Sequence, residues 1–276
     1  MKRGIQLKTR IISGFIAAVL VLGLFILNAY FDITLLITVS IISALAVYEM
    51  LKNTGCVKNI VMVLTAMVYT ATMQFALLKY PIDPALITFV YLLVVVCFAV
   101  FDHEHFAGQQ ITMAVAMPII LAFAFHYILK LTDTSVLGYF YFILLLNFSC
   151  VADIFAYFVG RAIGKHKLAP VVSPKKTIEG SVGGAIGTCI GTVAICLVFE
   201  QLYSDDINIL LAILITPFMS IIGMLGDLVM SAIKRTYGIK DYGNIMPGHG
   251  GVLDRVDSVL LVAPALAIFL SYFPLV

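Results

Sequence analysis

A polar segment near the C-terminal end of this apolar chain, residues 226–257, holds the side chains best suited to chemistry. Asp227, Ser231 and Lys234 are spaced i, i+4 and i+7, so they share one face if the preceding apolar stretch continues as a helix. The same segment also contains Arg235, Lys240, Asp241, His249, Asp254, Arg255 and Asp257. Charges of both signs are expensive at membrane depth, so this clustering indicates a functional site.

Carboxylates and cationic side chains together suit the handling of phosphate groups. Mg²⁺ takes oxygen ligands, typically one or two carboxylates together with substrate phosphates. Lys and Arg neutralise the remaining phosphate oxygens, and the metal stabilises charge that develops during phosphoryl or nucleotidyl transfer. Glycines on both sides of His249 permit close backbone approach to a ligand. The alternative is a charge-paired network between helices that only stabilises the fold, but four Asp with several Gly exceed what such a pair requires.

A second polar stretch, residues 173–180, directly precedes the apolar stretch 181–199. Ser173, followed by a proline, predicts an N-cap with Pro at the first helical position. Lys175, Lys176 and Thr177 would then lie in a first helical turn, where free N–H groups and the helix dipole favour an anion. Lysines oppose the dipole of a bare helix, so their presence indicates an anion site. The alternative is a loop that is basic only for membrane topology.

The elements that must position these residues are membrane-spanning helices. Hydrophobic residues make up 62% of the 276 residues and charged residues only 12%, and the mean hydropathy is +1.09. Most apolar stretches approach the roughly 20 residues that a spanning helix needs, whereas barrel strands are roughly 10 residues long and alternate. We therefore predict an all-α, polytopic integral membrane protein with about nine transmembrane helices, at residues 11–29, 33–50, 59–78, 83–100, 110–129, 136–159, 181–199, 207–230 and 258–275. The second and fourth are short enough to be partly re-entrant.

The chain divides into N-terminal transmembrane helices at 1–135 and a C-terminal catalytic transmembrane region at 136–276 with two polar loops. The basic start of the first apolar stretch is typical of a signal peptide. Its apolar run is too long for one, however, and no clear cleavage site precedes Tyr30, so we expect a retained helix.

Membrane orientation follows from the positions of the basic residues. With the N-terminus inside and nine spans, 15 of the 17 basic residues fall on the inner side, and only Lys79 and Lys130 fall outside. Positive charge concentrates on the cytoplasmic side of membrane proteins. We therefore expect both polar loops, 160–180 and 231–257, to face the cytoplasm.

Glycines and cysteines carry less information. Gly183, Gly187 and Gly191 recur at four-residue spacing, which predicts close approach of another helix. The stretch lacks the Gly-Lys-Ser/Thr ending of a phosphate-binding loop. The five cysteines are scattered among apolar neighbours without a Cys-x-x-Cys pair, so we interpret them as small apolar residues.

Four short patterns resemble one known family. The two main ones are Ser231-x-x-Lys234-Arg235-x4-Lys240-Asp241 and Pro247-x-His249-Gly250-Gly251-x-x-Asp254-Arg255-x-Asp257. They resemble the signature of the phosphatidate cytidylyltransferases, also called CDP-diacylglycerol synthases. Two earlier patterns are similar to the same family: Asp153-x-x-Ala-Tyr157-x-x-Gly-Arg161 and Ser173-Pro-Lys-Lys-Thr-x-Glu-Gly180. The resemblance spans most of the C-terminal half, whereas the N-terminal half shows only a compatible number of spans.

This resemblance implies a multi-pass enzyme of the cytoplasmic (inner) membrane, commonly a homodimer, with its active site facing the cytoplasm. It would transfer CMP from CTP to phosphatidic acid, giving CDP-diacylglycerol and pyrophosphate, with Mg²⁺ and sometimes a monovalent cation such as K⁺; no nucleic acid is implied. By position, Asp227 and Asp254 would be metal ligands and, with Lys234 and Asp241, the catalytic residues. The substrate-binding residues would be Ser173, Lys175, Lys176, Thr177, Ser231, Arg235, Lys240, His249, Arg255 and Asp257.

Two other classes of protein remain as alternatives. A CTP-dependent polyprenol or phytol kinase shares part of the motif region. An ion-coupled transporter would use intramembrane carboxylates to move an ion, and predicts charges at mid-span positions in several helices. Here the first five spans carry almost no charge, with Glu49 the nearest. The CDP-alcohol phosphotransferases are excluded because their Asp-rich motif is absent.

Overall fold

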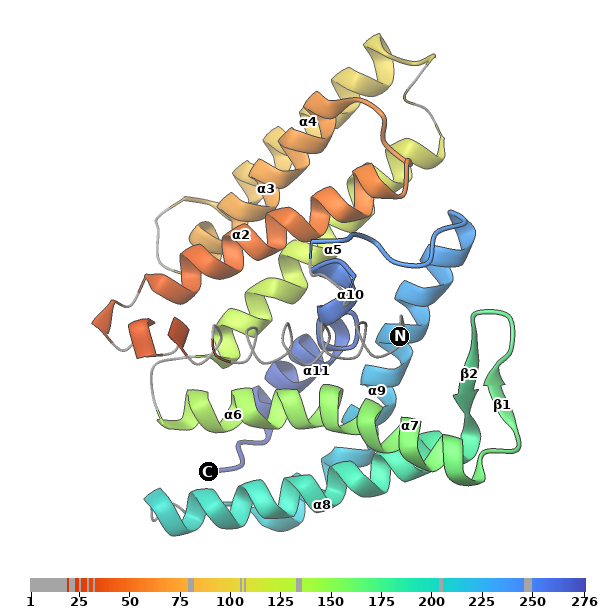
Figure 1. The fold of residues 1–276 in the computed structure, drawn as a ribbon. Helices are drawn as coiled ribbons and strands as arrows, with labels where there is room; N and C mark the ends of the chain where they lie inside the picture. The colour runs from red at the N-terminus through yellow and green to blue at the C-terminus, as the bar shows by residue number, and fades with distance from the viewer. Residues whose placement is uncertain are drawn as a thin grey trace. The chain divides into compact units, whose positions relative to one another are not determined.

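The computed structural model describes residues 19, 23–24, 26–28, 30–31, 33–78, 82–104, 106, 108–132, 136–203, 206–245 and 250–276 of the 276-residue chain. The first predicted span, 11–29, and His249 therefore lie largely or wholly outside the described residues. Within the described part, the chain is helical apart from one small sheet (Figure 1), which confirms the all-α prediction.

Helices and two short strands follow one another along the chain. The helices are α2 (Thr34–Tyr48), α3 (Ile60–Leu78), α4 (Pro84–Phe101), α5 (Gln109–Leu131), α6 (Val136–Leu146), α7 (Ala152–Ile163), α8 (Ile178–Tyr203), α9 (Ile209–Thr236), α10 (Leu253–Val256) and α11 (Val259–Tyr272). A π-helical turn extends α2 over Glu49–Asn53, and another joins α6 to α7 over Asn147–Val151. Strand β1 (Lys167–Ala169) pairs antiparallel with β2 (Ser173–Thr177).

Seven helices in the described part are long and apolar enough to cross a membrane. The protein is therefore a polytopic integral membrane protein. The predicted short spans, the second and fourth, are helices of 20 and 18 residues, long enough to span. The last predicted span, 258–275, differs: its helix α11 has only 14 residues, about 21 Å at 1.5 Å per residue. The predicted total of nine is thus not reproduced by the residues described.

The chain forms two compact units. The first unit comprises residues 1–129 and 236–256, and so contains α2 to α5 together with the loop that ends in α10. The second unit comprises residues 130–235 and 257–276, with α6 to α9, the β-hairpin and α11. This division differs from the predicted division at residue 135, because a C-terminal loop packs with the N-terminal helices.

In the first unit, α3 lies between α2 and α4 (Figure 1). Tyr69 of α3 stacks on Tyr91 of α4 with ring centroids 4.3 Å apart. Gln74 Nε2 donates to the carbonyl of Ala122 on α5 at 3.1 Å. Polar side chains thus find partners inside the helical bundle, as burial in an apolar environment requires.

In the second unit, α7 and α8 run side by side, with the β-hairpin at one end (Figure 1). A Cβ at Gly183 would lie 2.5 Å from side-chain carbons of Val159, and one at Gly184 would lie 2.8 Å from the carbonyl oxygen of Ala152. Both distances are closer than atoms can pack. The predicted role of the α8 glycines in close helix packing is therefore confirmed.

A series of hydrogen bonds between buried polar side chains links the helices of the second unit. Asn147 Nδ2 donates to the carbonyl of Thr188 at 3.1 Å and to Thr192 Oγ1 at 3.0 Å. Thr192 Oγ1 in turn lies 2.9 Å from Thr216 Oγ1 on α9. Hydrogen bonds between helices of this kind stabilise packing in lipid, and they hold α8 and α9 in the positions that frame the candidate site.

Candidate active site

The basic segment that was predicted to begin a helix at Ser173 forms a strand instead. Residues Ser173–Thr177 make β2, and α8 begins only at Ile178. The predicted N-cap at Ser173 is wrong, because β2 pairs with β1, Lys167 lying opposite Thr177 and Ala169 opposite Ser173. Lys175 and Lys176 therefore lie on an extended backbone rather than in a first helical turn.

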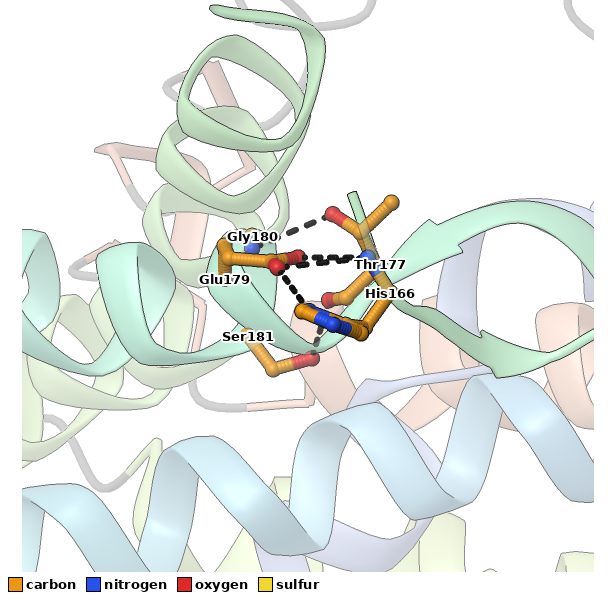
Figure 2. A network of polar contacts seen from close by, with 5 residues as sticks. All are labelled: His166, Thr177, Glu179, Gly180 and Ser181. Atoms are coloured by element: carbon orange, nitrogen blue, oxygen red, sulfur yellow. Dashed lines mark hydrogen bonds and ion pairs between the residues drawn. The ribbon is translucent and has the colours of Figure 1, made fainter. Parts of the chain in front are cut away.

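Thr177, not Ser173, caps α8. Its Oγ1 accepts a hydrogen bond from the backbone N–H of Gly180 (Figure 2), with 3.1 Å between the two heavy atoms. Ser181 Oγ donates to the carbonyl of Thr177 at 3.0 Å. A threonine oxygen that accepts from the third helical N–H is the usual N-cap arrangement. Thr177 is 5% exposed, so its predicted role in binding substrate is now joined by a structural one.

Glu179, in the first turn of α8, connects that helix to the start of the β-hairpin. Its carboxylate accepts from the backbone N–H of His166 at 3.2 Å, and its Oε1 lies 2.6 Å from His166 Nδ1 (Figure 2). The contact joins the residue before β1 to the first turn of α8. It fixes the hairpin against the helix, and the hairpin in turn fixes Lys176.

Lys176 of β2 pairs with Asp227 of α9. The distance from Nζ to Oδ2 is 2.5 Å, and each side chain is about one-fifth exposed. The Nζ atom itself is buried and finds no partner of good hydrogen-bond geometry among the residues that the structure describes. At 2.5 Å the two groups form a close ion pair, and an ammonium has three N–H donors, of which one pair with a carboxylate oxygen occupies at most one. An ammonium with donors to spare is well suited to phosphate oxygens.

The pair lines a cavity of about 280 Å³ within the second unit. Its polar wall includes Asp153 of α7, which interacts electrostatically with both Lys176 and Asp227. Ser173, Lys175 and Thr177 also line it, and Ile221 and Met224 supply an apolar part of the wall. The cavity thus has a charged end beside apolar surface, which fits an amphiphilic ligand.

A second ion pair lies next to the first. Lys234 Nζ of α9 is 3.7 Å from Asp257 Oδ2, and both side chains are nearly buried. Asp257 also hydrogen-bonds with Asp227, which Lys234 attracts as well. Burial raises the pKa of Asp257 to about 7; the Asp227 carboxylate adds to the rise and the Lys234 ammonium opposes it. Without a cation, a proton therefore stays on this carboxyl close to neutral pH.

The continuous helix predicted for Asp227, Ser231 and Lys234 is confirmed, because α9 runs to Thr236. On this helix Asp227 pairs most closely with Lys176 of β2, while Lys234 lies beside Asp257 and also attracts Asp227.

Three carboxylates, Asp153, Asp227 and Asp257, interact with two ammonium groups in this unit. The donor set fits a hard cation, since oxygen ligands and excess negative charge suit Mg²⁺. Within the described part of the chain, however, no group of three or more His, Cys, Asp or Glu could hold a metal ion alone. A metal here would need oxygens from the substrate, as Mg²⁺ commonly does.

Four other predicted residues, Lys240, Asp241, Asp254 and Arg255, belong to the first unit. Asp254 is 7% exposed, and its Oδ2 accepts from the backbone N–H groups of Tyr242 at 2.7 Å and Gly251 at 3.0 Å. Lys240, Asp241 and Arg255 are exposed. One oxygen of Asp254 thus organises its own loop, and its predicted role as a metal ligand stays a prediction.

Within the second unit, the structure brings one set of predicted residues together. Brought together in the second unit are Lys176, Asp227, Lys234 and Asp257, with Ser173, Lys175 and Thr177 around the cavity. Ser231 is buried on α9, and Arg235 is exposed in its last turn.

Two residues were missed as site candidates. Asp153 belonged to a motif that resembles the family but was given no role. Glu49 was noticed only as a charge near an apolar span, although such a charge is by default a functional signal.

The fold and this site define a class: polytopic membrane proteins with a buried site of paired carboxylates and lysines. The sequence profile of the cytidylyltransferase family matches residues 8–273, and the chain belongs to that family. A phosphatidate cytidylyltransferase of Bacillus subtilis (strain 168) is 31% identical over 278 residues, covering 98% of this chain and 99% of the relative. One of Staphylococcus haemolyticus (strain JCSC1435) is 52% identical over 120 residues, which are 44% of this chain and 45% of the relative.

Proposed function

We propose that this protein transfers CMP from CTP to phosphatidic acid, giving CDP-diacylglycerol and pyrophosphate. Family membership and the names of the relatives support this reaction. The structural observation that carries it is the buried Lys176 ammonium, paired with Asp227 at the charged end of a cavity with apolar walls. A lipid phosphate needs both parts of such a cavity, a cation for the phosphate and apolar surface for the glycerol and acyl chains.

This reaction does not require a strong general base. A phosphate oxygen of phosphatidic acid, already an anion at neutral pH, attacks the α-phosphorus of CTP. The new P–O bond forms as the bond to the bridging oxygen breaks, and pyrophosphate leaves with that electron pair. Positioning and neutralisation of charge then supply most of the rate. Lys176 and Lys234 would neutralise phosphate oxygens, with Lys175 at the rim of the cavity.

Magnesium is the cofactor that these residues suit. We propose Asp227 and Asp257, which contact each other, as its carboxylate ligands, with Asp153 nearby and Asp254 retained as a prediction from sequence. When bound, the ion would supply charge stabilisation at the reacting phosphates. The raised pKa of Asp257 supports this placement, because a cation would replace the proton that this carboxyl otherwise keeps.

The cytoplasmic side of the inner membrane is the proposed location of the site, with the chain as a homodimer. Two contacts support one common side for the predicted inner loops. Asn53 Nδ2 donates to the carbonyl of Tyr242 at 2.8 Å, and Lys176 pairs with Asp227. The first contact joins two segments that the distribution of basic residues had assigned to the inner side, and the second joins such a segment, 160–180, to the predicted span 207–230, which leads into the other inner loop.

One assay tests the reaction. The purified protein is incubated with CTP, phosphatidic acid and Mg²⁺, using CTP labelled in the α-phosphate. Label in the lipid, with pyrophosphate release that requires all three components, supports CMP transfer. A kinase would leave the α-label in the nucleotide and place γ-label in the lipid, and a transporter would label no lipid; either result refutes the proposal.

A further inference from the structure

Glu49 is a fully buried carboxylate in the first unit, at the start of the π-helical turn after α2. Its Oε1 accepts from the backbone N–H of Val252 at 3.0 Å, and its Oε2 accepts from that of Leu253 at 2.8 Å. Both oxygens are thus committed to consecutive amides of the loop 242–254, which carries the second signature pattern. A buried carboxylate is tolerated when it is hydrogen-bonded in this way.

Two glycines of this loop lie against the Glu49 carboxylate. A Cβ added to Gly251 would lie 2.5 Å from each Glu49 oxygen, and one added to Gly243 would collide with Glu49 Oε1. Neither glycine has a positive φ, so conformational freedom does not explain them. Their lack of a side chain leaves room for the Glu49 carboxylate, and this accounts for a glycine at both positions.

Two further side chains hold the same backbone. Asn53, one turn beyond Glu49, donates to the Tyr242 carbonyl at 2.8 Å. Asp254 Oδ2 accepts from the Tyr242 and Gly251 N–H groups. Among the described residues of the loop, Tyr242 is therefore held by Asn53 and Asp254, Gly251 by Asp254, and Val252 and Leu253 by Glu49. The direction of the Asp254 and Arg255 side chains depends on this backbone, because Leu253 and Asp254 are adjacent.

We propose that Glu49 is a positioning residue of the enzyme: it holds the backbone of Val252 and Leu253 and thereby sets the orientation of Asp254 and Arg255, to which the family signature gives metal- and substrate-binding roles. The proposal rests on the proposed function, which gives the signature loop its role. Glu49 would then be an N-terminal residue that contributes to activity, although the N-terminal half of the sequence resembles the family only in its number of spans. Supporting residues of this kind typically change activity by roughly 10- to 100-fold when lost.

The test compares Glu49→Gln with Glu104→Gln, the same chemical change at an exposed position of the same unit. The amide keeps the shape of the carboxylate but turns one acceptor into a donor that faces a backbone N–H. Two measurements are made on full-length protein in detergent: hydrogen exchange of the Val252 and Leu253 amides, and kcat and KM for CTP. We expect Glu49→Gln to speed exchange at these amides but not in α3, and to lower kcat/KM roughly 10- to 100-fold, while Glu104→Gln matches the wild type.

A second variant covers the case in which Glu49→Gln does not fold. Gly251→Ala displaces the same carboxylate from the other side, so it should give the same local exchange and kinetic loss. Combined with Glu49→Ala, it should add little, since the two changes remove one interaction.

Unchanged exchange at Val252 and Leu253 in either variant overturns the proposal, as does faster exchange throughout the first unit. Local exchange that rises while kcat/KM stays at the wild-type value overturns it equally. Wild-type protein that transfers no CMP refutes the proposed function instead, and the exchange measurement then decides alone whether Glu49 holds the loop.

Discussion

Replacement of Lys176 by Met removes the ammonium that pairs with Asp227 while keeping a long apolar side chain. Asp227 then loses its nearest cation, 2.5 Å away, inside a cavity that also contains Asp153. We expect two separate losses, one of folding stability and one of catalytic rate. The first arises from an uncompensated buried carboxylate, and the second from an absent donor for phosphate oxygens.

The size of each loss follows from the surroundings of the pair. Removing one partner of a fully buried pair costs about 3–5 kcal/mol. Here each side chain is about one-fifth exposed, and Lys234 also attracts Asp227, so we expect about 1–3 kcal/mol of unfolding free energy. Loss of one group that stabilises transition-state charge lowers kcat by about 10²–10³-fold.

The assay pairs thermal unfolding in detergent with α-labelled CTP turnover, and the matched control is Lys167→Met. Lys167 carries the same charge on the adjacent strand β1 but is exposed and lies outside the cavity lining. In a double-mutant cycle, Asp227→Asn should restore part of the stability lost in Lys176→Met and none of the activity. The reasoning is refuted if Lys176→Met and Lys167→Met behave alike in both measurements.

Three further predictions follow. Thr177→Val should lower the unfolding free energy by about 1 kcal/mol, because the Gly180 N–H loses its hydrogen-bond acceptor. Thr177→Ser keeps a hydroxyl acceptor and should keep the wild-type stability. Equal melting temperatures for the two variants would show that Thr177 does not cap α8. Gly184→Leu should force α7 and α8 apart and lower the unfolding free energy by about 1–3 kcal/mol. The control, Ala194→Leu on the exposed face of α8, should leave the unfolding free energy nearly unchanged. Similar losses of stability in the two variants would refute close packing at Gly184. The pKa of Asp257 is raised from 3.8 to about 7 on folding, so without divalent cation its contribution to stability is fully present below pH 3.8 and is lost as the pH rises through about 7. Asp257→Asn should remove this dependence from thermal melts taken in chelator, and an unchanged pH profile would show that another group is responsible.

Local patterns in the sequence predicted those features that depend on local physics. A helix in lipid must satisfy its backbone internally over about 20 apolar residues, so hydropathy alone predicted seven of the spans that the described part of the chain shows, the second to the eighth. The spacing of Asp227, Ser231 and Lys234 placed them on one face of a helix that the structure shows to be continuous through Thr236. The glycine spacing in α8 likewise predicted its close packing.

The hairpin shows where local signals failed. Ser173 followed by proline is compatible with a helix N-cap, yet the segment pairs with Lys167–Ala169 and the cap is Thr177, four residues later. Strand pairing is a contact between separate segments, so no pattern within residues 173–180 could reveal it. The same pairing placed Lys176, rather than Lys234, nearest to Asp227.

By itself, the sequence determined the class of protein, the family signature and most of the charged residues around the site, because composition, periodicity and motif are local properties. Only the tertiary structure decided which charges meet. Glu49 contacts amides 203 and 204 residues away in the chain, and Lys176 contacts Asp227 across a strand and a helix. Such partners are chosen by packing and by the need to satisfy buried charges, which depend on neighbours in space rather than in sequence.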